Sequence, residues 1–144
     1  MTVSLSGDFS QMQEVFNRIE DLIPFYDRVG EYAVLKTRER LHLTKISPDG
    51  SHWAPWTLYT LDRRILKGNV GQGLLWDTGA LLNDVRFEVD GNFGVSIGTY
   101  LEYGLTLQEG IPGTQEPRPW LGWDENDKAA IMGFATEYFI TGVM

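Results

Sequence analysis

The sequence predicts an α+β fold, in which N-terminal helices and a C-terminal helix pack on a small antiparallel β-hairpin or sheet. Residues 85–89 and 93–97 alternate apolar and polar side chains, as strands with one buried face do. Asp90-Gly91-Asn92 between them favours a reversing turn. Because a lone hairpin is marginally stable in water, we expect the amphipathic helical stretches elsewhere to cover it. The face to be covered comprises Val85, Phe87, Val89, Phe93, Val95 and Ile97.

Length and composition predict one domain over residues 1–144, with a helical part at about 8–67 and a hairpin and C-terminal helix part at about 74–144. The chain has no cysteine, which excludes disulfides, thiol catalysis and thiolate metal sites. No stretch approaches the roughly 18 apolar residues of a membrane span, and the first residues lack the features of a signal peptide. We therefore expect no membrane association, and folding in a cytoplasm.

The formal net charge of −8 lies entirely in the second half of the chain. Residues 1–70 carry nine basic and nine acidic side chains, whereas residues 71–144 carry three and eleven. This acidity argues against nucleic-acid binding, which depends on neutralising phosphates, so no sequence-specific nucleic-acid partner is expected. An acidic half is compatible both with a merely solvated face and with docking on a basic protein surface.

Two helices are expected at the start of the chain. From Asp8 to Ile23, apolar residues recur at spacings of three and four, and Ser6 or Asp8 can cap the first turn. Pro24 either ends this helix or begins the next, since it has no amide hydrogen to donate. The second helix is expected from about residue 27 to residue 46, and the two form either a hairpin of helices or one kinked helix. The stripe on the first helix comprises Phe9, Met12, Phe16, Ile19 and Ile23.

The middle of the chain begins with a turn at residues 47–50 and an aromatic loop that contains Trp53 and Trp56. Thr57 to Lys67 is expected to form a short basic helix with its apolar residues inward. A glycine-rich loop follows at residues 68–73, without the spacing of a phosphate-binding loop. The inward residues are Leu58, Leu61, Ile65 and Leu66, and the outward ones are Arg63, Arg64 and Lys67.

Beyond that loop, residues 77–79 are expected to start a short helical turn that carries Leu81 and Leu82. After the hairpin, a helix from Tyr100 to Glu109 is expected, with Thr99 as cap and Gly110 closing it. A proline-rich loop at residues 111–119 leads to a final helix. Asp124 should cap that helix together with Asp127, and its apolar stripe comprises Ala130, Ile131, Phe134, Tyr138 and Val143.

Catalytic and metal-binding patterns are missing from the sequence. Its two histidines, His42 and His52, have no partner at metal-ligand spacing, and the nucleophile-elbow, kinase and dinucleotide fingerprints are absent. We therefore expect no enzyme activity, no metal and no cofactor. The five tryptophans are more informative, because Trp is enriched at protein interfaces. They either cover the edges of a small core or lie in subunit contacts.

The order of several short motifs resembles the phage virion morphogenesis and tail completion proteins of tailed bacteriophages, of the Mu-like prophage type. The motifs run from an Asp-Gly-x-x-Trp segment at residues 49–53 to a Leu-x-x-Thr-Gly-x-Leu segment at residues 75–81. They continue with tyrosines at residues 100 and 103, and with Pro-Arg-Pro-Trp-Leu-Gly at residues 117–122. The resemblance covers nearly the whole chain.

The resemblance implies a structural role in the virion neck, namely tail completion or head–tail joining by a homo-oligomeric ring. A hexamer and a dodecamer are the two ring sizes it leaves open. The implied partners are head-side connector proteins and tail tube or terminator proteins, with assembly in the host cytoplasm. Arg118, held extended between two prolines, is available either for a neighbour's carboxylate or for a pair within its own chain. The candidate interface residues are Trp53, Trp56, Arg63, Arg64, Lys67, Trp76, Tyr100, Tyr103, Arg118 and Trp120.

Other functions stay open from the sequence alone. Within virion assembly, the chain could be a tail terminator or a scaffold-like factor that is absent from the mature particle. In a different class, it could be a small ligand-binding module or enzyme with a pocket beneath its tryptophans. Loss of assembly on reversing the charges of Arg63 and Arg64, with the fold retained, would favour the ring.

Overall fold

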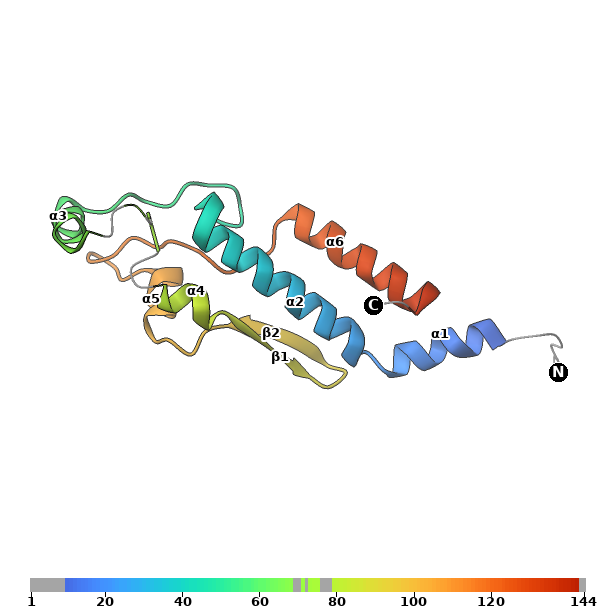
Figure 1. The fold of residues 1–144 in the computed structure, drawn as a ribbon. Coiled ribbons are helices and arrows are strands. Elements are labelled where there is room, and N and C mark those ends of the chain that lie inside the picture. Colours follow the sequence, from blue (N-terminus) through green and yellow to red (C-terminus); the bar gives the residue numbers. More distant parts are fainter. Residues whose placement is uncertain (1–9, 69–70, 72, 76–78, 143–144) are drawn as a thin grey trace.

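A computed structural model describes residues 10–68, 71, 73–75 and 79–142, with side chains from residue 13 onward. The described elements are six α-helices, two of them continued by a π-helical turn, and two strands (Figure 1), which confirms the α+β prediction. In order they are α1 (Ser10–Glu20), α2 (Ile23–Glu39), η1 (Arg40–Thr44), α3 (Leu58–Lys67), α4 (Ala80–Asp84), β1 (Arg86–Asp90), β2 (Gly94–Gly98), α5 (Tyr103–Glu109), α6 (Glu125–Thr136) and η3 (Glu137–Thr141).

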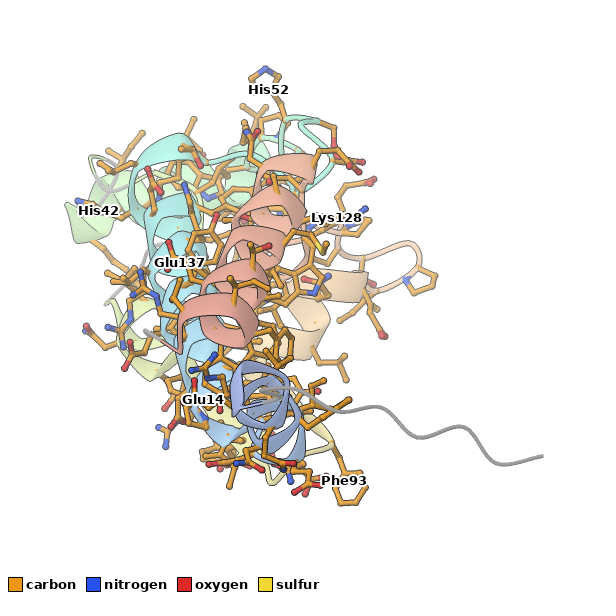
Figure 2. All side chains as sticks on the ribbon, turned by 90° about the vertical axis from the view of Figure 1, so that its right-hand side faces the viewer. Glu14, His42, His52, Phe93, Lys128 and Glu137 are labelled. Atoms are coloured by element: carbon orange, nitrogen blue, oxygen red, sulfur yellow. The ribbon has the colours of Figure 1, made fainter. Side chains whose placement is uncertain are left out.

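The two strands form the predicted antiparallel hairpin. Phe87 pairs with Ile97 and Val89 with Val95, so these apolar side chains share one face. Phe93 was expected on the same face, and that prediction is wrong. Asp90 pairs with Gly94, which leaves Phe93 as the last residue of a three-residue turn, 89% exposed and pointing away from the body (Figure 2).

Helix α2 covers the hairpin on one side and contacts α6 on the other (Figure 1). It buries Val29, Ala33 and Val34, and it places Gly30 against the Phe87 ring of the sheet. A Cβ on Gly30 would lie 2.2 Å from Cδ2 of Phe87, so glycine is required for this packing. The helix begins at Ile23, earlier than expected, with Pro24 in its first turn, which is where proline is tolerated.

The core lies where the C-terminal end of α2 meets the segment before α6. Trp120 is its largest fully buried side chain, and the indole Nε1 donates to the Gly104 carbonyl at 2.9 Å. The Trp53 indole donates to the Pro119 carbonyl at 2.7 Å, and Arg40 donates to the Trp120 carbonyl at 2.9 Å. These bonds satisfy polar atoms that burial would otherwise leave unpaired. The remaining core residues are Val34, Leu41, Leu81 and Val85.

Helix α1 does not fold back on α2. A two-residue break separates them, and α1 runs away from the body (Figure 1), so the pair is a broken helix rather than a hairpin. Its contacts are with η3, where Arg18 Nη1 donates to the carbonyls of Phe139 at 3.2 Å and Ile140 at 3.1 Å. Phe16 and Ile19, expected to help cover the core, are about half exposed, at 52% and 50%. Ser6, Asp8 and Phe9 lie outside the described residues.

Helix α3 has the predicted bounds, and its predicted orientation is only partly right: Leu61 is half-buried and Arg63 and Lys67 are exposed as expected, whereas Arg64 is half-buried. Thr57 caps it by accepting from the Thr60 amide at 3.3 Å, and Gly68 closes it in the left-handed conformation. Its apolar residues were expected inward, yet Leu58 is 80% and Leu66 86% exposed, and Ile65 is exposed too. The reason is position: α3 lies at the end of the molecule opposite α1, beyond the reach of α2 and the hairpin (Figure 1).

The C-terminal half follows the prediction at most turns. Asp124 and Asp127 form the expected reciprocal cap, with the Asp127 amide donating to Asp124 Oδ1 at 2.7 Å. Gly110 closes α5 by donating to the Thr106 carbonyl at 2.8 Å. Helix α5 starts three residues later than expected, because Thr99 donates to Asp84 and does not cap that helix. Val143, a predicted stripe residue, lies outside the described part of the chain.

Candidate functional site: a groove and two exposed helix faces

A half-open groove of about 1050 Å³ separates α3 from the loop at residues 111–118. Trp56 and Tyr59 line it on the α3 side, and Tyr103 and Leu107 of α5 line it on the other. Leu81 of α4 also lines the groove. Four predicted interface residues therefore converge here from distant parts of the sequence, namely Trp56, Arg64, Tyr103 and Arg118.

Arg118 makes hydrogen bonds to both sides of the groove. Its Nε donates to the Ala54 carbonyl at 2.7 Å, and its Nη2 donates to the Pro55 carbonyl at 2.8 Å. The Arg118 amide donates to the Leu107 carbonyl at 2.7 Å. Burial lowers the pKa of the guanidinium. Of the two roles considered for Arg118, the structure shows the one within its own chain, with carbonyls in place of a carboxylate.

The basic side chains of α3 lie along the helix and around its aromatic neighbours. The Arg64 guanidinium stacks over the Trp56 ring at 4.7 Å from the centroid. The Arg63 guanidinium donates to the Tyr59 hydroxyl at 2.8 Å. Lys67 is exposed in the last turn, where a positive charge complements the helix dipole.

Three other candidates lie apart from the groove. Trp53 and Trp120 are 5% and 1% exposed, and both belong to the core of the chain. Tyr100 is exposed beside the hairpin, where Arg86 stacks over its ring at 4.4 Å. Its hydroxyl donates to Glu88, and this bond raises the pKa of Tyr100. Trp76 lies outside the described residues.

Two apolar helix faces are exposed in the structure, although the sequence analysis expected them to be buried. On α1 the exposed face comprises Phe16 and Ile19, continued by Ile23 at the start of α2. On α3 the exposed face comprises Leu58, Ile65 and Leu66. A signal for them was present: several amphipathic helices compete for one hairpin of two five-residue strands. Because α2 already covers that hairpin, the other stripes have too little apolar surface to pack on.

The two faces carry opposite charge and stand at opposite ends of the molecule (Figure 1). Near the α1 face, Glu14, Glu20 and Asp21 outnumber Arg18. On α3 a single aspartate, Asp62, stands against three basic residues, Arg63, Arg64 and Lys67. Figure 2 looks at the molecule from the α1 side, where Glu14 and the hairpin-tip Phe93 lie at the same end.

A half-buried lysine lies apart from the groove. Lys45, with left-handed backbone, donates to the Leu74 carbonyl at 2.7 Å, and burial lowers its pKa to about 8. Within the described ranges no three His, Asp or Glu side chains come together as a metal site. None of the described helices is long and apolar enough to cross a membrane.

A model of the phage virion morphogenesis family matches residues 9–139. The match includes α1, α3, the groove and the core, and it confirms the resemblance drawn from the ordered motifs. Comparisons with curated proteins and with solved structures found no match.

Proposed function

The chain belongs to the phage virion morphogenesis family and is thus a phage virion assembly protein, and from this premise we propose that it completes the tail or joins tail to head as a homo-oligomeric ring. In this role its partners are further copies of itself, head-side connector proteins, and tail tube or terminator proteins. Its place is the virion neck, and its work is structural rather than catalytic.

The observation that carries the proposal is the placement of the two exposed apolar faces. They belong to different helices, α1 and α3, at opposite ends of the protomer (Figure 1). Contiguous apolar surface left open on a soluble protein commonly marks an interaction site. When one surface of a subunit binds a different surface of the next, the contact repeats, and it gives a closed ring if the rotation closes.

Deletion of the gene from its phage tests the role. We expect DNA-filled heads and finished tails to accumulate unjoined, and wild-type protein supplied in trans to restore infectious particles. Electron microscopy of the lysate and mass spectrometry of purified particles are the measurements. Normal particles without the gene would contradict the proposal. A requirement for the gene, with the chain absent from particles, would favour the assembly-factor alternative.

A further inference from the structure

We propose that neighbouring copies join head to tail through two helices, with the exposed apolar face of α3 in one copy docked on the exposed stripe of α1 in the next. This inference rests on the proposed ring and names the surfaces that would build it. The α3 face comprises Leu58, Ile65 and Leu66, and the α1 stripe comprises Phe16 and Ile19, continued by Ile23 at the start of α2.

Helix α3 turns its more polar side to its own protomer. Thr60, Leu61 and Arg64 are half-buried, and they lie on one side of the helix. Leu58 and Leu66, on the other side, are 80% and 86% exposed. None of the residues of α3 is buried, so the helix is docked on its own chain by a narrow contact. Its wider apolar side remains available to a neighbour.

Helix α1 has the same arrangement with the opposite charge. Val15 and Arg18 are half-buried on the side that contacts η3. Phe16 and Ile19 are three residues apart and both exposed, so they form a ridge on α1, and Ile23 is exposed beyond the break, at the start of α2. Glu20, one position beyond Ile19, is exposed beside that ridge.

Charge decides which face meets which. On α3 the exposed Arg63 and Lys67 outnumber the exposed Asp62, so pairing α3 with α3 would bring a net positive face against its own copy, and pairing α1 with α1 would do the same with the net negative face that contains Glu20. Like charges at a contact oppose binding, whereas α3 against α1 places basic side chains next to acidic ones. The two faces of one protomer lie at opposite ends and do not meet (Figure 1), so the occupant is a second copy.

The absence of cysteine gives a direct test. Phe16→Cys and Leu66→Cys are introduced together in one chain, which is then oxidised at about millimolar concentration and, separately, in particles produced by complementation. We expect a ladder of dimers, trimers and higher species on a non-reducing gel. Either variant with a single cysteine should give cross-linked dimers and no larger species. Leu35→Cys with Leu66→Cys is the matched control, since Leu35 is 66% exposed on α2, away from the proposed contact.

A charge swap supplies the second test. Arg63→Glu with Lys67→Glu should lower the yield of the 16–66 ladder about tenfold, because like charges then face each other. Adding Glu20→Lys to the same chain should restore most of it. A 16–66 ladder no stronger than the 35–66 control, both in solution and in particles, would overturn the proposed contact.

The contact and the proposed function can fail separately. Suppose that the phage needs the gene and carries the chain in its particles, yet gives no 16–66 ladder. That result would support the proposed function and contradict the proposed contact. A strong ladder, together with normal particles after deletion of the gene, would support the contact and contradict the function.

Discussion

The centre of the molecule and its two end helices use apolar residues in opposite ways. Trp120 in the centre is 1% exposed and holds hydrogen bonds through its indole and its backbone. Leu66 on α3 is 86% exposed and belongs to a helix with no buried residue. The same residue types therefore stabilise the protomer in one region and remain uncovered in the other.

The difference predicts that stability and the proposed association of copies are separable in this chain. Substitutions in the centre should change the free energy of unfolding, because they remove contacts made within the protomer. Substitutions on the end helices should leave that free energy nearly unchanged and alter how copies associate. The following predictions test this separation, from the largest expected effect to the smallest.

Truncation of the central tryptophan should cost most. Trp120→Ala should lower the free energy of unfolding by about 3–5 kcal/mol, through lost burial and the cavity that remains. Urea denaturation followed by circular dichroism measures it, with Trp56→Ala as the control, because Trp56 is half-buried at the groove. Equal losses for both variants would contradict the comparison.

Two glycines in helices should respond to alanine with opposite signs. Gly30→Ala places a Cβ 2.2 Å from Phe87, and overpacking of this kind costs about 1–3 kcal/mol. Gly133→Ala on α6 meets nothing within 4 Å, and should stabilise by about 0.5–1 kcal/mol through helix propensity. Thermal unfolding of both variants is the measurement. A stabilised Gly30→Ala would show that α2 and the hairpin separate easily.

The hydrogen bond between α2 and the cap of α6 should make the free energy of unfolding depend on pH. The Tyr32 hydroxyl donates to Asp127 Oδ1 at 2.9 Å, and burial, followed by that bond, raises the pKa of Tyr32 to about 12. Because the folded pKa is above the unfolded value of about 10, the stabilisation is fully present below pH 10 and is lost as pH rises to about 12.

Tyr32→Phe should therefore cost about 1.5 kcal/mol at pH 7, as loss of a hydrogen bond to a charged group does. Its difference from the wild type should shrink between pH 10 and pH 12. Urea denaturation at a series of pH values measures the difference, and absorbance at 295 nm follows the tyrosine titration. A difference that stays constant up to pH 12 would contradict the assigned bond.

The end helices should give the smallest change in stability. Leu58→Ser with Leu66→Ser should shift the free energy of unfolding by no more than about 0.5 kcal/mol, since neither side chain packs within the protomer. The same pair of substitutions should abolish association, measured by light scattering of wild type and variant at matched concentrations. A large loss of stability would mean that α3 packs on its own chain more tightly than described.

Local features of the fold were predictable from the sequence. The antiparallel hairpin follows from alternation with period two, and the cap at Asp124 and Asp127 from residue types three apart. Pro24 marked a helix start or end, and it lies in the first turn of α2. Each of these depends on neighbours within a few residues, so a sequence pattern contains the needed information.

The tertiary features were less predictable. Helical spacing identified the stripes on α1 and α3 but did not show that α2, among the described helices, makes the main contact with the hairpin, which leaves Phe16 and Leu66 exposed. Phe93 was assigned to the strand face because the pattern does not fix how many residues the turn takes. The groove escaped prediction because Trp56 and Arg118 meet only through long-range packing.

The narrow attachment of α3 has a consequence for the timing of assembly. A helix without buried residues opens at little free-energy cost, so its amides should exchange with solvent early. A neighbour that binds α3 must also hold it in place, and part of the binding energy is spent on that ordering. If copies join through the proposed contact, free copies should associate slowly, and a surface that orders α3 of the first copy should start the assembly. The same loosely held helix that exposes an apolar face would thus delay ring closure until a finished tail is present to nucleate it.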